Sequence, residues 1–120
     1  MAKKILVVDD EPDVLKILLL RLKKTGYEVI GARDGQEALD MARQIIPDLI
    51  VLDFHLPDMN GDEVARILKE DKILRNIPII LISATISSVA ERAKECGANG
   101  YIAKPFEPKE LIGAVKKILG

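Results

Sequence analysis

An aspartate follows directly after a short apolar run near the middle of the chain. Residues 49–52 are Leu-Ile-Val-Leu, a pattern typical of a strand buried on both faces of a parallel sheet, and Asp53 comes next. In open α/β sheets the ligand crevice lies beyond the carboxyl ends of the strands, so this position indicates a binding site. Aspartate is also a common turn residue, and on this stretch alone a turn-capping role is an equal alternative.

Polar residues also follow three other apolar runs. They are Asp9 and Asp10 after residues 5–8, Ser83 after residues 79–82, and Lys104 after residues 100–103. In a parallel sheet these positions meet Asp53 at one edge. Helix capping, local hydrogen bonding or exposure to solvent would explain each residue alone. Their joint placement at successive strand ends favours a common site.

Carboxylates that converge at this edge repel one another and require positive charge nearby. Lys104 supplies one charge, and a hard divalent ion would best supply the rest. Because the ligands are oxygens and no His/Cys cluster accompanies them, Mg²⁺ is favoured over zinc. Carboxylates, a lysine and a hydroxyl around Mg²⁺ form an arrangement suited to a phosphoryl group.

The elements that must position these residues alternate between strands and helices. Apolar runs at residues 5–8, 27–32, 49–52, 79–82 and 100–103 predict five strands. Helical periodicity predicts helices over 13–24, from 34 to 46, from about 60 to between 69 and 75, from about 88, and from 108 to the end of the chain. Strict alternation favours a parallel sheet with helices on both faces, joined right-handedly.

Apolar spacing assigns an inner face to each helix. The expected inward residues are Val14, Leu15, Ile17, Leu18, Leu19, Leu20 and Leu22; Ala38, Leu39, Ala42, Ile45 and Ile46; Val64, Ile67 and Leu68; Leu111, Ile112, Val115, Ile118 and Leu119. The helix from about 88 offers only Val89, Ala90, Ala93 and Cys96, so we expect it to be held less firmly. Capping-box spacing places helix starts at Asp34 and Asn60.

Composition excludes several classes of protein. The 120 residues carry 18 Lys+Arg and 19 Asp+Glu with no basic block, so we expect no direct binding to nucleic acid. The single cysteine, Cys96, cannot form an internal disulfide, and no signal-peptide pattern follows Met1, which favours a reduced, cytoplasmic setting. No apolar run approaches the ~20 residues of a membrane span. We expect all 120 residues to form one domain.

Four motifs together resemble the receiver domain of two-component response regulators. They are Asp9-Asp10 after KILVV, the segment DLIVLDFHLPDMNG, the run IILISA, and GYIAKPF. The resemblance covers the whole chain, residues 1–120. It implies a flavodoxin-like, doubly wound (βα)5 three-layer sandwich whose parallel five-stranded sheet has the order 2-1-3-4-5.

The resemblance also implies roles for the site residues. Asp53 matches the phospho-acceptor, Asp10 a direct Mg²⁺ ligand, and Asp9 a residue that holds the metal through water. The backbone carbonyl of His55 would be a further ligand, and Mn²⁺ is expected to be able to replace Mg²⁺. Lys104 matches the phosphate-pairing lysine, and its bond to Pro105 is typically cis in this family.

Two further residues match the switch of this family. Ser83 corresponds to the switch hydroxyl and Tyr101 to the switch aromatic, although Tyr101 as a half-buried core residue is the alternative. The side chains of His55 and Thr85 match positions that influence access of the hydrolytic water. We therefore expect His55 to tune the lifetime of the acyl phosphate.

The implied activity is transfer of a phosphoryl group to Asp53 from the phosphohistidine of a sensor histidine kinase or phosphotransfer protein. Slow autodephosphorylation would reset the protein. Such a chain catalyses its own phosphorylation and dephosphorylation but acts as a signalling switch. The change would pass through Ser83 and Tyr101 to the face of the fourth helix, fifth strand and fifth helix, which binds a downstream protein or effector. The expected state is a monomer or a phosphorylation-linked dimer.

Three other functions fit the sequence less well. A haloacid-dehalogenase-type phosphatase needs a second aspartate where this chain has His55. A flavin-binding flavodoxin needs a phosphate loop where Asp9, Asp10 and Glu11 would repel a phosphate. A degenerate receiver would not keep the full acidic set and Lys104. Since no effector domain is expected in the chain, it is either a stand-alone receiver or one cut from a longer regulator.

Overall fold

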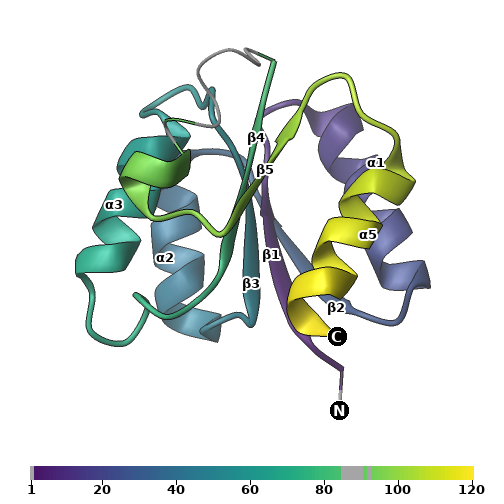
Figure 1. Ribbon diagram of the computed structural model, residues 1–120, viewed down its shortest axis with the longest axis horizontal. Coiled ribbons are helices and arrows are strands. Elements are labelled where there is room, and N and C mark those ends of the chain that lie inside the picture. The colour runs from purple at the N-terminus through teal and green to yellow at the C-terminus, as the bar shows by residue number, and fades with distance from the viewer. Residues whose placement is uncertain (1, 85–90, 92) are drawn as a thin grey trace.

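Five parallel strands form one sheet in the computed structural model, which describes residues 2–84, 91 and 93–120 (Figure 1). The strands are β1 (Lys4–Val8), β2 (Glu28–Ala32), β3 (Leu49–Asp53), β4 (Ile79–Ser83) and β5 (Gly100–Ala103). Their order is β2-β1-β3-β4-β5, and each neighbouring pair is parallel. The predicted α/β fold and strand order are therefore confirmed.

Helices cover both faces of the sheet (Figure 1). They are α1 (Pro12–Lys24), α2 (Gly35–Ile45), α3 (Gly61–Glu70) and α5 (Pro108–Leu119). Helices α2 and α3 lie on one face and α1 and α5 on the other. Residues 93–96 are also helical, whereas the predicted start of that helix, 88–90, and Thr85 lie outside the described residues. Within the described residues, no helix combines the length and hydropathy needed to cross a lipid bilayer.

Alternate side chains of the central strands pack into two apolar cores, one on each face of the sheet. In β1, Leu6 and Val8 pack toward α2 and α3, while Ile5 and Val7 pack toward α1 and α5. This follows from the two-residue period of a strand. All five residues of β3 are buried, as expected for a strand in the centre of a doubly covered sheet. The core therefore holds the carboxyl ends of β1 and β3 side by side.

The apolar stripes of three helices are narrower than the sequence predicts. Helix α1 packs through Leu15, Leu18 and Leu22. The prediction that Ile17, Leu20, Ile46 and Ile67 lie inward is wrong, because these side chains are 50%, 52%, 51% and 38% exposed. A straight helix meets a sheet along one line, so flanking residues project away from it. Ile46 lies past the end of α2 in a left-handed backbone conformation (φ 45°).

Capping predictions were correct at one helix and partly wrong at another. Asp34 caps α2, where its Oδ1 accepts the Glu37 N–H at 2.7 Å. Asn60 precedes α3 as predicted but makes no side-chain cap, because the Glu63 N–H bonds to the Asn60 carbonyl and to Asp62 Oδ1, both at 3.0 Å. The Lys104–Pro105 bond is cis, as expected.

Candidate functional site

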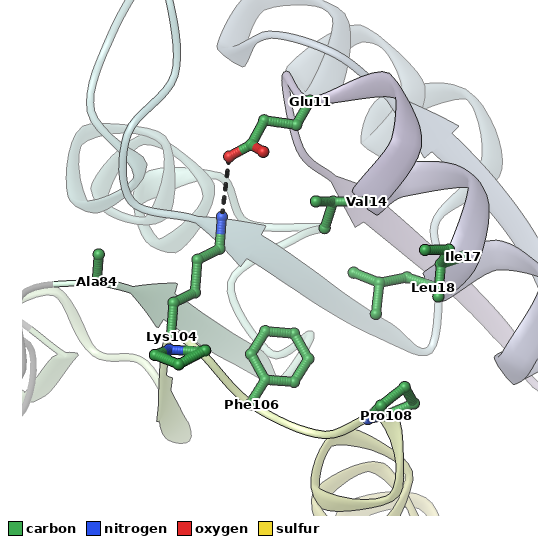
Figure 2. Close-up of a pocket in the computed structure, with 9 residues that line it drawn as sticks. Glu11, Val14, Ile17, Leu18, Ala84, Lys104, Phe106 and Pro108 are labelled. Atoms are coloured by element: carbon green, nitrogen blue, oxygen red, sulfur yellow. Dashed lines mark ion pairs between the residues drawn. The ribbon is translucent and has the colours of Figure 1, made fainter.

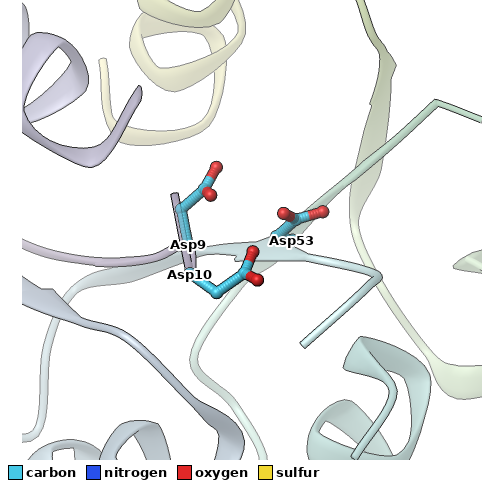
Figure 3. A group of neighbouring side chains, drawn as sticks. All are labelled: Asp9, Asp10 and Asp53. Atoms are coloured by element: carbon cyan, nitrogen blue, oxygen red, sulfur yellow. The ribbon is translucent and has the colours of Figure 1, made fainter. Parts of the chain in front are cut away.

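Three carboxylates converge where β1 and β3 end (Figure 3). Asp53 is the last residue of β3, and Asp9 follows β1, whose Val8 is in register with Leu52. Oxygens of Asp9, Asp10 and Asp53 all lie within 4.8 Å of one another. Asp9 and Asp53 are only 1% and 3% exposed, whereas Asp10 is exposed. The cluster is therefore buried on one side and open to solvent on the other.

Lys104 supplies the positive charge of this cluster from the end of β5. Its Nζ lies 3.1 Å from Asp53 Oδ2 and 3.5 Å from Asp9 Oδ2. A longer ion pair of 3.8 Å joins it to Glu11 Oε1 (Figure 2). The Lys104 N–H donates to the Ser83 carbonyl at 2.8 Å, which holds the base of the side chain against β4. One lysine thus faces several carboxylates.

Electrostatics at Asp53 reflect this imbalance of charge. Burial raises the pKa of Asp53, and the charge of Asp9 raises it further, while hydrogen bonds from Lys104 and the His55 N–H only partly offset this rise. Burial lowers the pKa of Lys104, but the hydrogen bond and charge of Asp53, with the charges of Asp9 and Glu11, raise it overall. The ionised cluster therefore holds more negative charge than Lys104 neutralises.

The donor set fits a hard divalent cation. All three converging groups are carboxylates, and oxygen ligands suit Mg²⁺. The exposure of Asp10 leaves the cluster accessible from solvent. A second cation at this position would offset the negative charge that Lys104 leaves unbalanced.

The loop after Asp53 is closely folded against β3. The Gly61 N–H donates to the Phe54 carbonyl at 2.6 Å, and His55 and Asn60 form an isolated antiparallel bridge. A Cβ at Gly61 would lie 2.5 Å from the Asp53 carbonyl oxygen, so only glycine allows this approach. His55 is exposed, and its N–H donates to Asp53 Oδ1 at 3.4 Å. The loop thus begins in contact with the Asp53 carboxylate.

Ser83 and Tyr101 lie in different environments. Ser83 ends β4 and is 2% exposed, whereas Tyr101 of β5 is 51% exposed. The register pairs Ser83 with Ala103 and Leu81 with Tyr101, so the two residues are offset along the sheet. Four predicted residues are brought together: Asp9, Asp10, Asp53 and Lys104. Thr85 lies outside the described residues.

Two acids near the site were missed by sequence reasoning. Glu11 is the third partner of Lys104, and its place directly after the aspartate pair was a signal for it. Asp58, in the loop after Asp53, binds the start of α2 through the N–H groups of Gly35 and Gln36. No local pattern marks Asp58, because its partners are distant in sequence.

Comparison with known proteins agrees with this geometry. The chain is 44% identical over 120 residues to the alkaline phosphatase synthesis transcriptional regulatory protein PhoP of Bacillus subtilis, covering 99% of this chain and 49% of that protein. It is 39% identical over 121 residues to the polar-differentiation response regulator DivK of Brucella ovis, covering 100% and 98%. The chain therefore spans about half the length of PhoP and nearly all of DivK.

Two solved structures have the same fold. The chemotaxis response regulator CheY4 of Vibrio cholerae superposes with a TM-score of 0.93 at 30% identity, covering 98% of this chain and 99% of that one. The receiver domain of the sensor histidine kinase PA1611 of Pseudomonas aeruginosa, with a magnesium ion coordinated in its active-site cleft, gives 0.91 at 30% identity, covering 100% and 99%. The family model for the response regulator receiver domain matches residues 5–116, and the chain belongs to this family of two-component signalling domains.

Proposed function

We propose that the chain, as one unit of residues 1–120, is a phospho-accepting receiver in which Asp53 takes a phosphoryl group from a phosphohistidine. The donor is a sensor histidine kinase or a phosphotransfer protein in the cytoplasm. The observation that carries this proposal is the buried Asp53 carboxylate, 3.1 Å from Lys104 Nζ and within a cluster of three converging aspartates. A nucleophile, a charge-pairing lysine and a metal-binding donor set are thereby in reach of one phosphoryl group.

The proposed metal ligands are Asp10, Asp53 and the His55 backbone carbonyl, with Asp9 holding the ion through a water molecule. Mg²⁺, for which Mn²⁺ can substitute, supplies neutralisation and orientation of the phosphoryl oxygens when it is bound. The magnesium ion in the cleft of the PA1611 receiver domain supports this assignment by analogy. The all-oxygen donor set of this chain supports it directly.

The proposed reaction is an in-line displacement at phosphorus. An Asp53 carboxylate oxygen forms a bond to phosphorus while the bond to the imidazole nitrogen of the donor breaks, which gives an acyl phosphate and a free histidine. Lys104 pairs with the negative charge of the transferring group. In the hydrolysis that resets the protein, a water oxygen forms a bond to phosphorus while the bond to the Asp53 carboxylate oxygen breaks, which releases inorganic phosphate and the free carboxylate. The exposed His55 tunes access of that water, together with Thr85, which lies outside the described residues.

Output is proposed to pass from the acyl phosphate to one face of the molecule. The Ser83 hydroxyl donates to a phosphoryl oxygen, and Tyr101 moves toward the space that this shift opens. The burial of Ser83 at the end of β4 and the exposure of Tyr101 support this relay. A downstream protein or effector then binds the face of the helix that includes residues 93–96, β5 and α5. The protein acts as a monomer or as a phosphorylation-linked dimer.

The test is phosphorylation by a small-molecule donor. Incubation with acetyl phosphate and Mg²⁺, followed by intact-mass measurement, should show a mass gain of one phosphoryl group. A chelator or the Asp53→Asn variant should abolish the gain. The control is Asp40→Asn, because Asp40 is an exposed acid on α2 that pairs with Arg43. An adduct that persists in Asp53→Asn would refute the assignment of the acceptor.

The half-life of the acyl phosphate provides a separate test of the proposed role of the His55 side chain. His55 is exposed and its backbone N–H lies 3.4 Å from Asp53 Oδ1, so His55→Ala should open the approach of water and shorten the half-life of the acyl phosphate. Decay of the phosphorylated mass after donor removal measures this half-life. An unchanged decay rate would reject a role for this side chain.

A further inference from the structure

Asp58 joins the loop after Asp53 to another element. Its Oδ1 accepts the Gly35 N–H at 2.7 Å, and its Oδ2 accepts the Gln36 N–H at 2.9 Å. These N–H groups belong to the first two residues of α2 and have no acceptor within the helix. Both oxygens of one carboxylate are therefore used to hold the start of α2.

A packing contact reinforces this attachment. A Cβ at Gly35 would lie 2.9 Å from the Met59 Sδ, so Met59 packs directly on the backbone of the first residue of α2. A side chain at this position would have to displace Met59 from this contact. Asp58 and Met59 thus attach the second half of the loop to α2, while the buried Phe54 and Leu56 hold the first half in the core.

Hydrogen bonds from backbone N–H groups explain why Asp58 can hold this position as a charged group. Desolvation raises the pKa of Asp58, but the N–H groups of Gly35, Gln36, Met59 and Asp58 itself together outweigh this and lower it overall. A carboxylate at the N-terminus of a helix also interacts favourably with the helix dipole. The ionised form is therefore the one that makes both bonds to α2.

The loop that Asp58 holds carries one of the proposed metal ligands. His55 and Asn60 are bridged, and the Gly61 N–H binds the Phe54 carbonyl, so residues 54–60 form a closed turn. His55, whose N–H contacts Asp53, belongs to the same closed turn as Asp58. The attachment of Asp58 to α2 therefore restrains the turn that carries the His55 carbonyl.

We infer that Asp58 is a positioning residue for the metal and phosphoryl site, because it fastens the loop to α2 and so fixes the His55 carbonyl. The inference rests on the proposed function of that site. Asp58 touches neither the acid cluster nor Lys104 in any contact that the described residues make. Its effect on the site is therefore exerted through the loop.

The experiment compares two acids that cap the same helix. Asp58→Ala removes the bonds to Gly35 and Gln36, while the matched control Asp34→Ala removes the bond to Glu37 but leaves the loop attached. Calorimetric titration of each unphosphorylated variant with Mg²⁺ gives the dissociation constant. Orienting partners of metal ligands change affinity by about 10–100-fold, and we expect Asp58→Ala to lie near the low end, about tenfold. Asp34→Ala should leave the constant unchanged.

Two further measurements separate positioning from loss of stability. Metal-free hydrogen exchange should show faster exchange at residues 54–60 in Asp58→Ala but not in Asp34→Ala, although both variants lose thermal stability. The conservative variant Asp58→Asn keeps one acceptor oxygen and should restore part of the Mg²⁺ affinity.

Equal Mg²⁺ affinity in Asp58→Ala and wild type would overturn the inference, as would an equal loss in Asp34→Ala. If wild type binds Mg²⁺ and takes up the phosphoryl group while Asp58→Ala does both equally well, the inference alone fails. If wild type itself binds no Mg²⁺, the proposed function fails and this inference fails with it.

Discussion

Two groups of aspartates lie at the carboxyl edge of the sheet and have opposite energetic consequences. Asp9 and Asp53 are buried beside Lys104, and burial raises the pKa of Asp53. Asp58 is exposed and Asp34 is partly buried at the start of α2, where backbone N–H groups bind them and lower the pKa of Asp58. The same residue type is thus destabilised as an anion in one place and stabilised in the other.

The difference shows that the hydrogen-bond donors around an aspartate, more than the number of neighbouring acids, decide whether its ionised form is stabilised. Helix α2 offers unpaired N–H groups that stabilise a carboxylate. Among the described residues, Asp53 at the end of β3 accepts hydrogen bonds from Lys104 and the His55 N–H, the latter at 3.4 Å. A buried anion that is incompletely compensated retains affinity for an added cation. That residual affinity is what the proposed Mg²⁺ and phosphoryl site requires.

The largest expected effect comes from removing Lys104, the cation that the described residues place in the buried cluster. Lys104→Met keeps the length of the side chain and deletes its charge, so the phosphorylation rate with acetyl phosphate should fall by about 10²-fold or more. Time-resolved intact-mass measurement gives the rate. The control is Lys109→Met, which removes an exposed lysine paired only with Glu107 among the described ion pairs. A rate within a factor of two of wild type, as roughly expected for a surface pair, would show that Lys104 is dispensable.

The next effect concerns the buried acid beside Asp53. Asp9→Asn keeps the oxygen that accepts the Glu11 N–H but removes the charge, so the affinity for Mg²⁺ should fall by about 10–100-fold. Calorimetric titration measures it. Asp13→Asn, in the exposed first turn of α1, should leave the affinity unchanged. Equal constants for wild type and Asp9→Asn would remove Asp9 from the metal site.

A smaller effect is expected on stability at Asp53. Because its pKa is raised above 3.8 in the folded state, ionised Asp53 destabilises the fold at pH values above that raised pKa, and this penalty disappears as the pH falls toward 3.8. In metal-free buffer at neutral pH, Asp53→Asn should raise the midpoint of thermal unfolding by about a few degrees. The gain should shrink in acid and when Mg²⁺ stabilises wild type. A lower midpoint in Asp53→Asn would contradict this sign.

The smallest effect has the opposite sign and belongs to Asp58. Its pKa is lowered below 3.8 in the folded state, so its stabilising contribution is present above 3.8 and is lost as the pH falls through the lowered pKa. Wild type should exceed Asp58→Asn by about a degree or two at neutral pH, and the difference should close in acid. Paired thermal melts across pH measure this. If the midpoint difference from wild type changed with pH in the same direction for Asp53→Asn and Asp58→Asn, the contrast between the two groups of aspartates would be refuted.

Local pattern was sufficient for much of the fold. Strand positions, the burial of β1 and β3 and the Asp34 cap all follow from apolar period and capping chemistry. The same rules gave wrong predictions for Ile17 and Leu20, which are exposed. Periodicity identifies the apolar residues of a helix, but it does not show how much of the helix surface the neighbouring elements cover. The strand order came from the family resemblance, since period alone does not state which strands are neighbours.

The sequence by itself determined that Asp9, Asp53, Ser83 and Lys104 stand at strand ends, because an apolar run that stops at a polar residue is a local signal. Only the tertiary structure decided that Lys104 Nζ lies 3.1 Å from Asp53, which is 51 residues away, and that Asp58 caps α2 across 22 and 23 residues. Such contacts depend on strand order and loop path. The charge balance of the site is therefore set by tertiary packing and cannot be predicted from the spacing of residues in the sequence.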